Sequence, residues 1–161
     1  LLDLPRALGV EWLDPGRAVT GDDLQAAAAH GGVTVGAGDF VFVRTGAMTA
    51  VRARGGWGDY AGGDAPGLGL ESVDWVAERD VAAIAADTWG LEVRPNQTPD
   101  VNQPLHIIFI VYMGLWLGEI FDLDPLADDC AADGVYEFFF CGPPLPFTRA
   151  VGSPLNPMAV K

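Results

Sequence analysis

An apolar run of 11 residues, from Ile107 to Leu117, lies between His106 and Glu119 and is interrupted by Gly114. A membrane-spanning helix needs roughly 20 such residues, so the run predicts a buried segment of a water-exposed domain. His106 and Glu119 are 13 residues apart, and on one continuous helix their side chains would point more than a right angle apart. We therefore expect a helix up to Met113, a turn at Gly114, and a strand that returns past the helix.

The remaining pattern alternates strands with helices and contains no internal repeat, which predicts an α/β fold. Leu1 to Leu4 resembles the end of a strand that is already under way, so the sequence is expected to begin inside a longer chain. The expected strands span residues 40–46, 81–87, 115–120 and 135–142, and the expected helices span 24–30, 71–78, 106–113 and 125–132; residues 55–69 form a glycine-rich loop.

The charge balance excludes one class of partner. The chain has 161 residues, which suits one domain, with 22 acidic and 9 basic residues and a net charge of −13. Its only lysine is Lys161. Such a surface repels phosphate backbones, and we expect neither a nucleic-acid nor a membrane partner. The two cysteines, Cys130 and Cys141, allow at most one disulfide, which is typical of a protein from the cytoplasm.

Several short motifs have ordinary structural explanations. Gly36-Ala37-Gly38 and Gly67-Leu68-Gly69 match a dinucleotide fingerprint only in part, and turn glycines explain them better. Ser153 stands in Gly-Ser-Pro, outside the Gly-x-Ser-x-Gly context of a hydrolase nucleophile. The acidic group in residues 122–129 lacks the glycine and closing glutamate of a calcium loop, so a solvated helix start is the better interpretation.

His106 and Glu119 remain as the candidate site. An imidazole and a carboxylate that meet at one edge of a helix-turn-strand unit suit zinc or manganese. A buried hydrogen bond between the two side chains explains the same pattern equally well.

The sequence also resembles the cyclase family of metal-dependent hydrolases, which includes bacterial kynurenine formamidase, isatin hydrolase and a dienelactone hydrolase. The stretches that carry the resemblance are GDFVFVRTG, PGLGLESVDWVAERDVAAIAADTWGLE, PLHIIFIVYMGLWLGEIFDLDPLA and DGVYEFFFCGPPLPFTRAVGSPLNPMAV. The resemblance implies a swivelling β/β/α fold and a divalent metal, zinc or manganese, bound by the residues that match His106 and Glu119.

The same resemblance implies hydrolysis of amide, lactam or ester bonds in small cyclic or aromatic-derived molecules. The family motif His-x-Gly-Thr-His-x-Asp-x-x-x-His, which supplies the other ligands and the catalytic histidine, is absent from this chain. Residues 1–161 are therefore expected to be the C-terminal portion of a single hydrolase domain, with no catalytic residue of its own and a homo-oligomeric full-length parent. Candidates for lining the substrate pocket are Trp57, Tyr60, Asp87, Trp89 and Ser153.

An alternative function belongs to a different class. The chain could be a non-catalytic domain that keeps the fold and packs against a partner chain. The absent motif favours this alternative for the chain alone, and the pair His106 and Glu119 favours a hydrolase for its parent.

Overall fold

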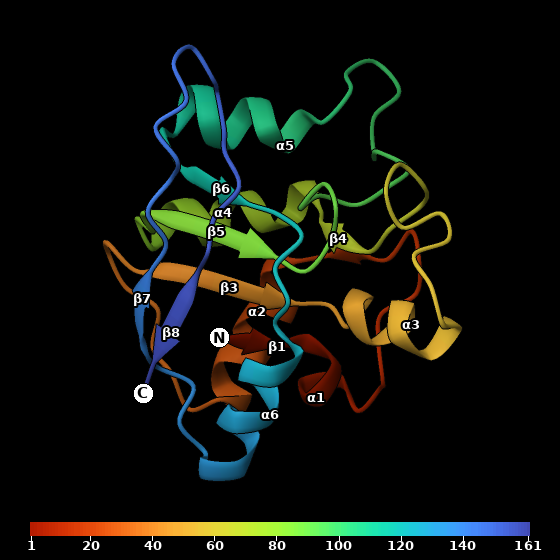
Figure 1. The fold of residues 1–161 in the computed structure, drawn as a ribbon. Coiled ribbons are helices and arrows are strands. Elements are labelled where there is room, and N and C mark those ends of the chain that lie inside the picture. Colours follow the sequence, from red (N-terminus) through yellow and green to blue (C-terminus); the bar gives the residue numbers. More distant parts are fainter.

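A four-stranded parallel sheet forms the centre of the molecule in a computed structural model that describes residues 1–161 (Figure 1). The strand order is β1 (Leu2–Asp3), β3 (Phe40–Arg44), β5 (Ala83–Ala86) and β6 (Trp116–Gly118). All three neighbouring pairs run parallel, with Val41 opposite Ile84 and Ile84 opposite Leu117. The α/β class predicted from the sequence is confirmed.

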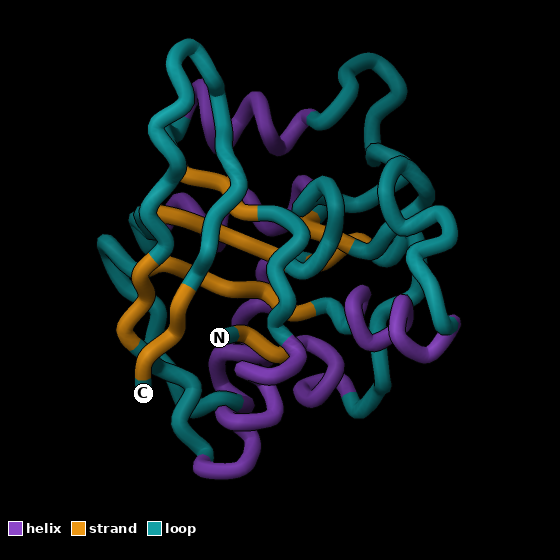
Figure 2. Tube along the Cα trace, viewed as in Figure 1, coloured by secondary structure: helices purple, strands orange, loops and turns teal.

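Helices and two small ladders surround this sheet (Figure 2). The ladder β2–β4 is parallel and the ladder β7–β8 is antiparallel. The other elements are α1 (Leu4–Leu8), β2 (Ala18–Val19), α2 (Gly21–His30), α3 (Ala47–Arg54), β4 (Gly67–Leu68), the 3₁₀ turn η1 (Leu70–Ser72), α4 (Val73–Glu78), α5 (Pro104–His106), the π-helix η2 (Ile107–Tyr112), α6 (Asp124–Asp133), β7 (Phe139–Cys141) and β8 (Met158–Val160).

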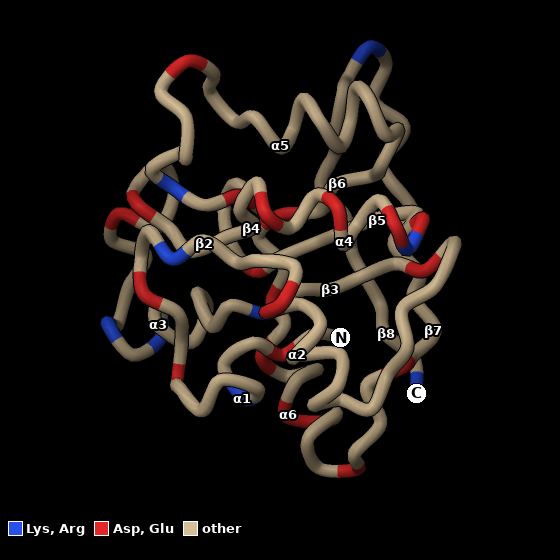
Figure 3. The backbone as a smooth tube through the Cα atoms, turned by 180° about the vertical axis from the view of Figure 1, so that it is seen from behind, with Lys and Arg blue, Asp and Glu red and all other residues tan.

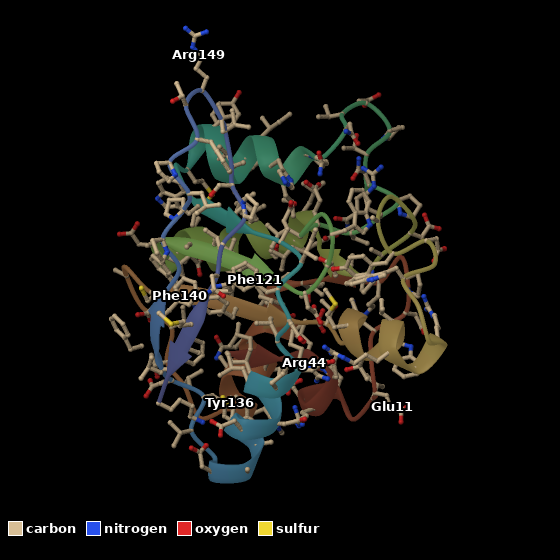
Figure 4. All side chains as sticks on the ribbon, in the orientation of Figure 1. Glu11, Arg44, Phe121, Tyr136, Phe140 and Arg149 are labelled. Carbon is tan, nitrogen blue, oxygen red and sulfur yellow. The ribbon has the colours of Figure 1, made fainter.

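The sheet buries both of its faces because alternate side chains of a strand point to opposite sides. Val41, Val43 and Ile84 belong to the larger core cluster, which includes residues of α2, α4 and η2. Phe42 and Ala85 belong to a second cluster with α6 and Tyr136. Phe121 and Phe140 pack against this second cluster, and Figure 4 labels both beside the strands.

Gly114 ends the helical segment, as the sequence predicted. Its φ of 72° lies in the left-handed region, which glycine adopts without steric cost. The Leu115 N–H donates to the Phe109 carbonyl at 2.8 Å, which closes the turn and starts β6. Residues 106–119 therefore do not form one unbroken helix.

The predicted burial of this segment is wrong. Within η2 only Phe109 is fully buried, whereas Val111 and Tyr112 are 70% and 80% exposed. The predicted helix itself is present, as a π-helix over Ile107–Tyr112. It follows α5 and lies above β6 in the view of Figure 1, so that one side of the helix contacts the larger core and the other faces solvent.

Residues 122–129 include a helix start, as predicted, and Asp122, Asp128 and Asp129 are exposed, but Asp124 is not. Asp124 begins α6 but is only 15% exposed, and its carboxylate accepts hydrogen bonds from Arg44 at 2.8 Å and Arg52 at 2.5 Å. Arg44, labelled in Figure 4, also binds Asp3 at 2.9 Å. These ion pairs tie β1, β3, α3 and α6 together, which the local sequence pattern does not reveal.

The remaining acidic residues are distributed along most of the chain, and Figure 3 shows how few basic positions accompany them. No helix of the structure is both long enough and apolar enough to cross a bilayer.

Candidate metal centre

The carboxyl ends of the four parallel strands share one edge of the sheet, and each carries polar side chains there. Asp3 and Arg44 are the last residues of β1 and β3, Asp87 directly follows β5, and Glu119 directly follows β6. In parallel α/β sheets this edge is where binding sites form. The fold therefore places Glu119 and Asp87 where the sequence predicted them, at strand ends.

His106 and Glu119 face each other at this edge. The imidazole Nε2 lies 3.1 Å from Oε1 of Glu119, and the two side chains are 23% and 33% exposed. Two ligands of a tetrahedral zinc ion with bonds near 2.1 Å would lie roughly 3.4 Å apart, so small side-chain movements would accommodate one ion between them. The two side chains are therefore as close as the sequence predicted, and their role as metal ligands stays a prediction, because the same distance also fits a direct hydrogen bond.

A third residue, Glu92, contacts the opposite nitrogen of the imidazole. Its Oε1 lies 2.7 Å from Nδ1 of His106, and the Glu92 residue is only 2% exposed. The same carboxylate accepts the backbone N–H groups of Leu105 and His106, each at 3.2 Å. His106 is thus held between two carboxylates, of which one is buried and the other reaches solvent.

The two carboxylates change the charge state of His106. The hydrogen bonds that the ring donates to Glu119 and, to a smaller extent, to Glu92 raise the pKa of the imidazole to about 9, against an opposing effect of burial. In the metal-free chain the ring therefore carries both protons at neutral pH and donates to both carboxylates. A cation at Nε2 would replace the proton that faces Glu119. The proton on Nδ1 would remain, and Nδ1–H would still donate to Glu92.

Asp87 has a different environment from the one expected of a pocket residue. Its carboxylate is completely buried and accepts the N–H and hydroxyl of Thr45, both at 2.8 Å, and the N–H groups of Gly46 and Ala47 at 2.9 and 3.0 Å. Burial raises the pKa of this carboxyl above its ordinary value, although the hydrogen bonds from Thr45 and Gly46 oppose the shift. All four donors stand at the start of α3, so Asp87 caps that helix.

The aromatic candidates lie beside Asp87. The Tyr60 hydroxyl donates to the Asp87 carbonyl at 2.7 Å, and its ring meets Trp57 edge-on at 5.2 Å. Burial, with the charges of Asp87 and Glu119, raises the pKa of the Tyr60 hydroxyl. Tyr60 and Trp89 line one small cavity of ≈ 40 Å³, and Trp89 Nε1 donates to the Gly63 carbonyl at 3.1 Å. Trp57 is 59% exposed.

Comparisons with known proteins assign the family. The family model named Cyclase matches residues 1–93, which is more than half of the chain. The chain belongs to the Cyclase family. No curated protein matches the sequence.

Three solved structures resemble most or all of the chain. The crystal structure of a novel cyclase is 36% identical, with a TM-score of 0.84 over 99% of this chain and 52% of its own. Isatin hydrolase A from Ralstonia solanacearum is 24% identical, with a TM-score of 0.72 over 92% of this chain and 55% of its own. An isatin hydrolase bound to the product analogue thioisatinate is 19% identical, with a TM-score of 0.70 over 98% of this chain and 57% of its own. The chain thus spans about half the length of these structures.

Ser153 lies apart from the other candidates of this Cyclase-family chain. It lines an open apolar groove of ≈ 440 Å³ between the sheet, η2 and the C-terminal segment, a groove that none of Trp57, Tyr60, Asp87 and Trp89 lines. The Ser153 hydroxyl accepts the Leu145 N–H at 2.9 Å and donates to the Pro154 carbonyl at 3.2 Å. The structure therefore brings His106 and Glu119 together, and places Ser153 among different neighbours.

Sequence reasoning missed Glu92. The signal that identified His106, a lone polar residue between apolar ones, is present here too, because Leu91 and Val93 are buried on either side. No group of three or more histidine, cysteine, aspartate and glutamate side chains has the arrangement of a complete metal site. Any further ligands of an ion at His106 and Glu119 would come from water, substrate or another polypeptide segment.

Proposed function

We propose that this chain is the ligand-bearing C-terminal portion of a metal-dependent hydrolase that acts on amide, lactam or ester bonds. Its substrates are small cyclic or aromatic-derived molecules, and its metal is zinc or manganese. The observation that carries the proposal is the 3.1 Å approach of His106 Nε2 to Glu119 Oε1 at the carboxyl edge of the sheet. Family membership and the isatin hydrolases among the similar folds support it.

In this proposal His106 supplies an imidazole nitrogen and Glu119 a carboxylate oxygen to the ion. A bound divalent ion supplies Lewis acidity, which lowers the pKa of water and polarises a scissile carbonyl. Glu92 accepts the hydrogen bond from Nδ1 of His106, the ring nitrogen that does not face Glu119. Tyr60 and Trp89 provide an aromatic wall near the Asp87 strand end. In this proposal the remaining ligands and the catalytic base come from outside residues 1–161, which correspond to about half the length of the similar structures.

A second candidate function is a non-catalytic domain that packs against a partner chain. The exposed apolar side chains of Val111, Tyr112 and Trp116, which are 70%, 80% and 72% exposed, favour such packing. The same surface supports a homo-oligomeric parent protein. Both unpaired cysteines support a cytoplasmic location for either function.

Calorimetric titration of the metal-free chain with zinc and with manganese tests the hydrolase proposal. We expect weak but measurable binding that falls at least tenfold in His106→Gln and in Glu119→Gln. Glu78→Gln is the control, since the Glu78 side chain is 76% exposed and lies at the end of α4, before the amino end of β5, whereas the pair lies at the carboxyl edge of the sheet. Equal affinities in all four proteins, or no binding by the unaltered chain, would leave the packing domain as the better assignment.

A further inference from the structure

We propose that Glu92 is a positioning residue that fixes the His106 imidazole with Nε2 toward Glu119. The inference rests on the proposed metal site and names a residue that this site needs but that does not touch the ion. A histidine ligand commonly donates its second N–H to a carboxylate, which sets the ring orientation and the nitrogen that remains free.

The contacts of Glu92 explain why it orients the ligand and does not act as one. Its Oε1 accepts from Nδ1 of His106 at 2.7 Å and from the His106 N–H at 3.2 Å, and its Oε2 accepts the Leu105 N–H at 3.2 Å. Both oxygens are therefore engaged within the protein. Glu119 has no comparable backbone donors and is more exposed, so it is the carboxylate that remains free to bind an ion.

The same carboxylate fixes the backbone that carries His106. Helix α5 starts after Gln103, whose φ of 54° is left-handed and whose side chain makes no capping hydrogen bond. Pro104 has no N–H, so the first free donors of the helix belong to Leu105 and His106. Glu92 accepts both. One side chain thus anchors the Cα position and the ring of His106 together.

Glu92 is itself held firmly. Its neighbours Leu91 and Val93 are 0% and 4% exposed, and the Val93 N–H donates to the Leu68 carbonyl at 3.0 Å. Glu92 also forms a parallel bridge with Leu68 of β4. A rigid anchor of this kind prevents the ring from turning away from Glu119.

Two substitutions separate the effects of orientation and charge. In Glu92→Gln the amide oxygen can still accept from Nδ1–H, although the NH₂ group then faces the Leu105 N–H. In Glu92→Met no acceptor remains at this position. Glu78→Gln is again the matched control, because it removes one carboxylate charge from an exposed site.

The first readout needs no metal. Proton NMR of the metal-free chain should show a downfield His106 Nδ1–H signal that exchanges slowly with water. The signal should persist in Glu92→Gln and Glu78→Gln and disappear in Glu92→Met. The second readout is zinc affinity, which should fall about 10- to 100-fold in Glu92→Met and less in Glu92→Gln, since loss of such partners has effects of this size.

Each outcome decides between the two proposals. The role of Glu92 is overturned if the unaltered chain shows no slowly exchanging Nδ1–H signal. It is also overturned if folded Glu92→Met still shows that signal. Unchanged zinc affinity in folded Glu92→Met overturns it as well. If the unaltered chain binds no zinc, the proposed function fails and the NMR signals alone decide on Glu92. If Glu92→Met does not fold, the decision rests on the Nδ1–H signal of the other two proteins. A slowly exchanging signal in both the unaltered chain and Glu92→Gln supports the role of Glu92, and its absence from the unaltered chain overturns it.

Discussion

Gly67 and Glu92 lie in direct backbone contact, and only a residue without a side chain fits at position 67. A β-carbon there would lie 2.6 Å from the carbonyl oxygen of Glu92 and equally close to that of Leu91. Gly67 belongs to β4, whose partner strand β2 lies on its other side. The close approach therefore helps to hold the backbone of Glu92, the residue proposed to position His106.

Gly67→Ala should accordingly destabilise the chain, because the backbone at Leu91 and Glu92 has to move. We expect a loss of about 1–3 kcal/mol, the usual range for an overpacked interior. Urea denaturation monitored by circular dichroism measures it. Gly56→Ala is the control, since no heavy atom lies within 4 Å of its added β-carbon and its φ is not left-handed. Equal midpoints for the two variants would show that the contact is easily relieved.

The stability of the metal-free chain should depend on pH through His106. Its folded-state pKa of about 9 lies above the ordinary histidine value of 6.5, so the protonated ring stabilises the fold. This contribution is fully present below pH 6.5 and is lost as the pH rises through 9. It amounts to a few kcal/mol at most. The free energy of unfolding should fall over this window more steeply in the unaltered chain than in His106→Gln.

The comparison with His106→Gln removes the contributions of all other titrating groups. Urea titrations at pH 6 and pH 9.5 are sufficient, because they bracket the window. Identical pH dependence in the two proteins would mean that the contacts with Glu92 and Glu119 do not stabilise the imidazolium.

Asp87 should be more important for stability than for binding. Its two oxygens accept four hydrogen bonds from Thr45, Gly46 and Ala47, and an asparagine would turn an NH₂ group toward N–H donors. Asp87→Asn should therefore lower the free energy of unfolding by about 2–3 kcal/mol. Asp59→Asn should change it little, because the Asp59 side chain is 83% exposed. Thermal unfolding of both variants checks this, and similar melting temperatures would contradict it.

Asp87 and Glu92 also explain which parts of the fold the sequence could predict. Helix α2 was recognised because its start is local: Thr20 and Asp23 form a capping box. Helix α3 starts after left-handed Gly46, which has no side-chain cap, and its first free N–H donates to Asp87 forty residues away. Helix α3 therefore escaped prediction, because the group that stabilises its start is distant in sequence.

The same limitation applies to the site. His106 and Glu119 were predictable because they flank one apolar run with a glycine turn, and family resemblance reinforced them. Glu92 caps α5 from another loop, so no spacing rule connects it with His106. The strand predicted over 135–142 is paired only at Phe139–Cys141, and its partner β8 lies in the C-terminal segment, where the sequence predicted no strand.

The isolated chain should show no amidase or lactamase activity. A catalytic zinc site usually has three protein ligands, whereas His106 and Glu119 provide two, and no complete ligand group exists elsewhere in the chain. A general base is also lacking, because His30 lies at the end of α2 with its ring against Tyr136, in a different part of the fold. N-formyl aromatic amines and small lactams, assayed with added zinc or manganese, should give the rate of buffer alone. Metal-dependent turnover that disappears in His106→Gln would show instead that two protein ligands are sufficient here.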